Sequence, residues 1–115
     1  MAQYEHLPVY KSIYDLIIYF HKLSRRFPKD FKYGLAQELR ENLTEILDKV
    51  VIANNIASKE QTLFEGEILI ERVKLKIRML KDLNVISLKS YEFVSRSLVD
   101  ISKQISAWKK WAKKG

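Results

Sequence analysis

Apolar residues recur at every third or fourth position in four long blocks of this 115-residue chain. That spacing brings them to one face of a helix, where neighbouring helices can bury them. The chain has only 3 Gly and 2 Pro, which are too few turn residues for a fold of many short strands. We therefore predict a single domain over residues 1–115, with helices at about 8–27, 31–55, 60–83 and 88–113.

The breaks between the blocks are short, and short connections make consecutive helices antiparallel neighbours. The predicted fold class is therefore all-α, an antiparallel up-down-up-down four-helix bundle. Phe27-Pro28 marks the first break, because proline interrupts a helix and pushes the preceding residue out of the α region. We expect a capping box at Ser58 to start the third helix, and Ser87 or Ser90 to cap the fourth.

Basic residues crowd the first and third breaks, which this topology places at the same end of the bundle. The net charge of +7 favours an anionic partner, most simply nucleic acid, although a basic surface can also serve solubility alone. Arg25 and Arg26 are the strongest candidates, because a planar guanidinium suits phosphate or carboxylate. Alternatively, they only pair with neighbouring carboxylates such as Asp30 or Glu38. The candidate binding residues are Lys22, Arg25, Arg26, Lys29, Lys32, Arg72, Lys74, Arg78 and Lys81.

The first and third predicted helices carry more apolar residues than one buried seam accounts for. A helix that is apolar most of the way round is normally buried on more than one side, and a small four-helix bundle offers no fifth helix to cover it. We therefore predict a subunit interface, against the alternative of a wide core stripe with scattered exposed apolar residues. The predicted interface residues are Tyr14, Ile18, Phe64, Ile68, Leu75 and Met79.

Residues suited to catalysis or metal binding are sparse. The chain has no cysteine, which excludes disulfides and thiolate sites and fits a reducing compartment. His6 and His21 lack the preceding glutamate of the Glu-x-x-His pattern found at bundle di-iron sites, and there is no Gly-rich phosphate loop. We therefore expect a cytoplasmic protein that is not an enzyme, with no metal, no cofactor and no membrane span.

The two tryptophans near the end of the chain lie among lysines and need separate interpretation. Trp108 falls on the apolar seam of the fourth helix and is expected in the core. Trp111 falls off that seam, between Lys110 and Lys113, where an exposed indole can stack on a nucleic-acid base.

Three short motifs are spread over nearly the whole chain. They are Leu7-Pro8-Val9-Tyr10-Lys11, then Phe27-Pro28 with Tyr33, then Lys81-Asp82-Leu83 with Ile86-Ser87. These motifs resemble the accessory variability determinant proteins of diversity-generating retroelements. That four-helix bundle family has a second branch, the proteins encoded by intervening sequences in bacterial large-subunit ribosomal RNA genes.

Two segments favour the accessory branch over the ribosomal RNA branch. The ending Ile105-Ser106-Ala107-Trp108 is similar to the small-small-Trp ending of the accessory branch, with Ser106-Ala107 where two glycines are common. The ribosomal RNA branch usually carries Asn-Ile-Ala-Glu-Gly after its second helix. Here Asn55-Ile56-Ala57 is followed by Ser58-Lys59 instead.

The resemblance implies a homopentameric barrel that binds the error-prone reverse transcriptase of a retroelement and RNA or DNA through a basic surface. Such a protein supports mutagenic retrohoming without chemistry of its own. The expected partners are the reverse transcriptase, RNA and/or DNA, and further copies of the chain, with no membrane. The alternative function is a stand-alone RNA-binding or structural four-helix bundle of the ribosomal RNA intervening-sequence type.

Overall fold

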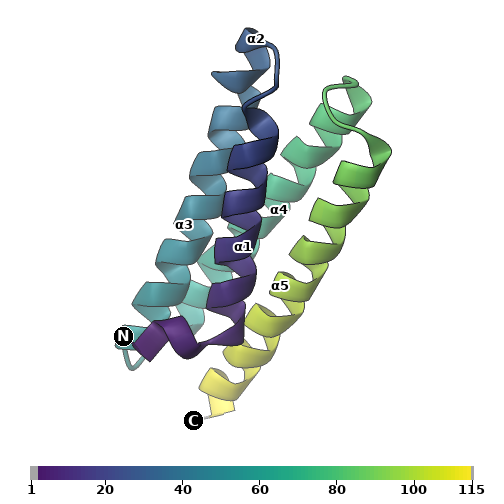
Figure 1. The fold of residues 1–115 in the computed structure, drawn as a ribbon. Helices are drawn as coiled ribbons and strands as arrows, with labels where there is room; N and C mark the ends of the chain where they lie inside the picture. Colours follow the sequence, from purple (N-terminus) through teal and green to yellow (C-terminus); the bar gives the residue numbers. More distant parts are fainter. Residues whose placement is uncertain (1–2, 115) are drawn as a thin grey trace.

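The computed structural model describes residues 3–114 and is built from helices and short connections (Figure 1). The elements are a short 3-10 helix η1 (Gln3–His6), α1 (Pro8–Ser24), the single turn α2 (Lys29–Lys32), α3 (Leu35–Asn55), α4 (Glu60–Asp82) and α5 (Leu88–Lys114). The four long helices run alternately up and down, so the predicted all-α four-helix bundle is confirmed.

Each long helix packs against two neighbours. α3 packs against α1 and α4, and α5 packs against the same two helices. Consequently α1 and α4 occupy opposite corners of the bundle, and α3 and α5 occupy the other two. A helix at a corner turns one side toward the core and leaves the opposite side outward, and the residues on those outward sides form the candidate interfaces below.

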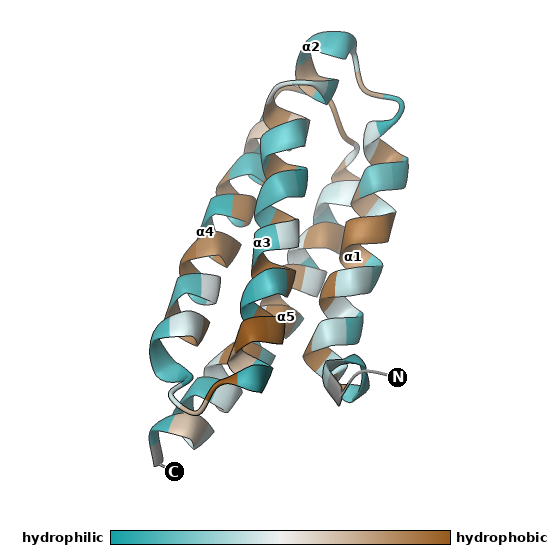
Figure 2. Ribbon diagram, turned by 90° about the vertical axis from the view of Figure 1, so that its left-hand side faces the viewer, coloured by the Kyte–Doolittle hydropathy of each residue, from teal (hydrophilic) through white to brown (hydrophobic). Residues whose placement is uncertain are grey.

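The core contains the residues whose spacing predicted it. Side chains turned inward alternate with polar side chains turned outward, and Figure 2 shows the corresponding hydrophobic and hydrophilic bands along each long helix. Burying each such aliphatic or aromatic side chain contributes about 1.5–3 kcal/mol relative to leaving it exposed. The largest fully buried side chains are Ile13, Leu16, Phe20, Leu39, Leu43, Ile46, Leu63, Ile70, Ile77, Leu80, Leu98 and Ile101.

The first predicted helix ends earlier than expected, at Ser24 rather than at residue 27. The chain then turns tightly, with the Phe27 N–H donating to the Ser24 carbonyl over 3.2 Å, before Pro28 adopts an extended conformation. Phe27 is nevertheless buried, and its ring meets the Phe20 ring edge-on with 6.0 Å between centroids. This aromatic side chain closes the end of the core from a turn instead of from a helix.

The second predicted helix, 31–55, is two elements, because the single turn α2 is separated from α3 by Tyr33 and Gly34. The expected capping box at Ser58 is also wrong. Lys59 is the residue that precedes α4, and its Nζ donates to the Ala53 carbonyl in the last turn of α3 at 2.6 Å and to the Ile56 carbonyl just after that helix. At α5 the prediction is confirmed for Ser87, whose Oγ accepts the Ser90 N–H at 3.1 Å.

The two glycines at Gly34 and Gly66 predict opposite effects of alanine. A Cβ at Gly34 would lie 2.6 Å from the carbonyl oxygen of Asp30, so Gly34→Ala must shift backbone and should lower the free energy of unfolding by at least about 1 kcal/mol. In α4, a Cβ at Gly66 would meet no atom closer than 3.8 Å. Gly66→Ala should therefore raise the free energy of unfolding by about 0.5–1 kcal/mol, because alanine favours the helix more than glycine does. Urea denaturation followed by circular dichroism measures both, and equal effects would contradict this assignment.

Candidate protein and nucleic-acid interfaces

The six predicted interface residues are all exposed, with between 39% and 62% of each side chain accessible. They form two groups on different helices. The α1 face consists of Tyr14 and Ile18, and the α4 face consists of Phe64, Ile68, Leu75 and Met79. Because α1 and α4 occupy opposite corners, the two faces do not merge into one patch on a single copy of the chain.

Two apolar faces at opposite corners constrain how copies of the chain can associate. A two-fold dimer pairs one patch with the same patch on its partner, and it would cover one of these faces while leaving the other in water. A head-to-tail contact places the α1 face of one copy against the α4 face of the next, so both faces are covered. Head-to-tail contacts generate rings when the rotation closes.

The basic end of the bundle is the end that carries both the α1–α2 connection and the α4–α5 connection, at the top of Figure 1. Lys22, Arg25, Arg26 and Lys29 are exposed there. Within residues 3–114, none of these four side chains forms a salt bridge. The expected alternative, pairing of the arginines with Asp30 or Glu38, is therefore not seen.

The α4–α5 side of the basic end is partly neutralised. Arg78 Nε lies 3.6 Å from a carboxylate oxygen of Asp82, and Lys81 Nζ lies 3.6 Å from the other. Lys81 also stands over the Tyr91 ring, 4.9 Å from its centroid. On the other side, Lys32 lies over Tyr33 at 5.7 Å. The free positive charge at this end comes mainly from the α1–α2 connection.

Arg72 and Lys74 do not belong to the basic end, so the predicted set of nine cations is not one cluster. Both residues lie near the middle of α4. Arg72 lines a groove of about 220 Å³ between α3 and α4, together with Glu45 and Glu65. Lys74 Nζ lies 3.6 Å from Glu71 one turn earlier.

Arg40 holds the α1–α2 connection in place, and the sequence analysis did not identify it. From α3, its Nη1 donates to Ser24 Oγ and its Nη2 donates to the Lys32 carbonyl, each at 2.9 Å. Ser24 is buried and in turn donates to the His21 carbonyl at 3.3 Å. One guanidinium thus ties the end of α1 and the end of α2 to α3. In the sequence, Arg40 is marked as a candidate for a partly buried cation by its position next to the buried residue Leu39.

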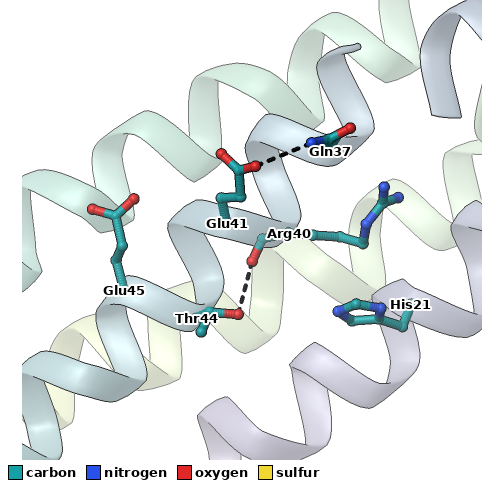
Figure 3. A pocket seen from close by; sticks show the side chains of 6 residues that line it. All are labelled: His21, Gln37, Arg40, Glu41, Thr44 and Glu45. Atoms are coloured by element: carbon teal, nitrogen blue, oxygen red, sulfur yellow. Dashed lines mark hydrogen bonds between the residues drawn. The ribbon is translucent and has the colours of Figure 1, made fainter. Parts of the chain in front are cut away.

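A groove of about 450 Å³ runs between α1 and α3 below this contact and is drawn in Figure 3. Its lining residues are His21, Gln37, Arg40, Glu41, Thr44 and Glu45. Burial lowers the pKa of His21, and the nearby positive charges of Arg40 and Arg25 lower it further. The Thr44 hydroxyl donates to the Arg40 carbonyl at 3.1 Å, within its own helix, and so is not directed at His21.

Two further searches of the described residues bear on the partners of the chain. Across residues 3–114, no three side chains of the His, Cys, Asp or Glu type are placed to hold a metal ion together. None of the helices in that part of the chain combines the length and apolar character that crossing a membrane requires.

A family model described as bAvd-like matches residues 7–112. The chain belongs to the bAvd-like family. The match spans all four long helices, so it includes both the basic end and the two apolar faces. The resemblance to the accessory variability determinant proteins is thereby confirmed. The comparison with curated proteins found no match.

The position of Arg40 in this bAvd-like chain predicts a stability effect. Arg40→Ala removes two hydrogen bonds from a charged group that join α3 to the ends of α1 and α2, and it should lower the free energy of unfolding by about 1.5–3 kcal/mol. Arg26→Ala, which removes an exposed arginine without a salt bridge, should change it by no more than about 0.5 kcal/mol. If urea denaturation showed equal losses of unfolding free energy for the two variants, Arg40 would not stabilise this end of the bundle.

Proposed function

We propose that this chain is a non-catalytic accessory protein of a diversity-generating retroelement. In this role it binds the error-prone reverse transcriptase and nucleic acid and supports mutagenic retrohoming. The observation that carries the proposal is a set of exposed cations, without salt bridges, at one end of a bundle that belongs to the bAvd-like family.

The basic end suits a partner with clustered carboxylates or phosphates. Arg25 and Arg26 present two adjacent guanidinium groups, each able to form paired hydrogen bonds to a planar or tetrahedral anion. Arg40 keeps the backbone beneath them in place, which reduces the ordering that binding would otherwise require. We therefore assign the contact with the polymerase to this end.

The proposal includes assembly into a homo-oligomer, and the number five rests on family resemblance alone. The α1 face and the α4 face support head-to-tail contact, because a single type of interface between the two faces then covers both of them in every copy. Burying these side chains contributes about 25 cal/mol for each Å² of apolar surface removed from water. Neither face includes the cations of the basic end, so assembly leaves that end free for a partner.

Replacement of both arginines tests the assignment of the polymerase contact. Arg25→Ala/Arg26→Ala should weaken capture of the cognate reverse transcriptase by on the order of 10-fold or more, because interface arginines often dominate binding. In nuclease-treated samples, where nucleic acid cannot bridge the two proteins, Arg96→Ala/Lys103→Ala is the matched control, since it removes the same charge from the outer side of α5 and should leave capture unchanged.

The readout is co-purification of the polymerase with each variant. Light scattering should show that both variants keep the oligomer size of the parent protein. Undiminished capture by the double arginine variant, with the oligomer unchanged, would mean that the polymerase uses another surface.

A further inference from the structure

Cations recur at intervals of seven residues along α5. They are Lys89, Arg96, Lys103 and Lys110. Seven residues complete almost two helical turns, so the four side chains follow one side of the helix, about 10.5 Å apart and about 31 Å from first to last. That side faces away from the core, because Val94, Leu98 and Ile101 are buried on the opposite side. We call these four residues the α5 ladder.

The ladder is open to solvent and keeps its charge. All four side chains are exposed, and within residues 3–114 none of them forms a salt bridge. Lys109, next to the ladder, is different, because its Nζ is paired with Glu67 at 2.6 Å. The carboxylate of Asp100 accepts from Gln104 at 2.9 Å and from Ser12 of α1 at 3.4 Å, which holds it on the α1 side of the helix.

Trp111 follows Lys110, the last cation of the ladder, and at about 100° per residue its side chain lies on the flank of α5 beside the ladder. At 66% exposed, its indole is more accessible than that of the preceding tryptophan, Trp108, which packs against the core. The last turns of α5 extend past the start of α1 (Figure 1), in keeping with the high exposure of this residue. An exposed aromatic ring at the end of a row of cations matches the combination by which proteins hold single-stranded nucleic acid.

We propose that the outer side of α5 is a track for single-stranded nucleic acid, with phosphates along the ladder and one base stacked on Trp111. A duplex offers the same phosphates but keeps its bases within the stack, so it cannot use the indole. This inference goes beyond the proposed polymerase contact, which uses residues at the end of the bundle. It relies on the proposed function only in taking nucleic acid as a ligand of the protein.

Acidic residues on the opposite corner of the bundle make the α5 side the more favourable one for an anionic polymer. The outward residues of α3, diagonal to α5, include Glu41, Glu45 and Asp48, all exposed. A nucleic acid is therefore repelled from the α3 side and attracted to the α5 side. Head-to-tail assembly through the α1 and α4 faces would leave the α5 ladder uncovered in every copy.

An anionic membrane is the other polyanionic partner to consider, and the apolar side of α5 argues against it. A helix that lies in a membrane surface buries its own apolar side among the lipids. Here that side packs inside the bundle, with Leu98, Ile101 and Ile105 almost fully buried. Trp111 is the large apolar side chain of α5 that stays exposed near this end of the helix, and a single indole is a small contact area for lipid.

Fluorescence of Trp111 tests the track directly. In a Trp108→Phe background, Trp111 is the only indole, and an oligothymidylate of about 20 nucleotides should quench it saturably while a duplex of equal length does not. Quenching that is equal with duplex would overturn the stacking, as would a response to phosphatidylglycerol vesicles without one to the oligonucleotide. Trp111→Ala should lower affinity for the oligonucleotide by on the order of 10-fold in an anisotropy assay that needs no intrinsic tryptophan.

Salt dependence tests the ladder. Each phosphate contact contributes about −0.7 to the slope of log K against log salt for a single strand, so Arg96→Gln/Lys103→Gln should flatten the slope by about 1.4. The matched control Lys11→Gln/Lys49→Gln removes two lysines, one on α1 and one on α3, that are already paired with carboxylates, so it should keep the parent slope, and equal flattening by the two variants would overturn the assignment to α5. A negative result in this salt titration would not change the capture of reverse transcriptase predicted for the basic end, so the two proposals are tested independently.

Discussion

Burial of one apolar seam from each of four helices is the constraint on which the rest of this structure depends. Once one side of each helix is buried in the core, as at Ile13, Leu39, Ile77 and Leu98, the opposite side of each helix must point outward at its own corner. The outward sides then differ in the residues they expose, which include large apolar side chains on α1 and α4, a row of carboxylates on α3 and a row of cations on α5. The core thereby separates two faces suited to subunit contact from one face suited to a polyanion.

The basic end depends on a second, smaller set of contacts. Phe27 closes the core beneath the α1–α2 connection, and the guanidinium of Arg40 ties that connection to α3 through Ser24 and Lys32. Hydrogen bonds from a charged donor to partly buried acceptors are costly to lose, so the turn is held more firmly than its lack of regular structure suggests. The protein therefore has two separate surfaces of exposed cations, one on the α1–α2 connection and one along α5. The two surfaces can bind different partners.

Helical periodicity was sufficient to predict the four long helices, the buried seams and the exposure of the six residues proposed as a subunit interface. It could not show where a helix ends when the last seam residue, as at Phe27, is buried from a turn. Arg72 and Lys74 were wrongly grouped with the basic end, because a rise of 1.5 Å per residue places them about 12–15 Å from the end of α4 at Asp82. Arg40 escaped notice because its partner Ser24 is 16 residues away, and only the packing of α3 on α1 brings them together.

Cross-linking between copies tests head-to-tail contact most directly, because the chain has no cysteine of its own. Ile18→Cys places a thiol on the α1 face and Ile68→Cys places one on the α4 face. With a short thiol-reactive linker, the protein carrying both substitutions should form a ladder of covalent oligomers that ends at the size of the closed ring. Each single variant should remain unlinked, because its thiols lie apart in neighbouring copies. Efficient linking of either single variant to itself, or no linking of the double variant, would contradict the account.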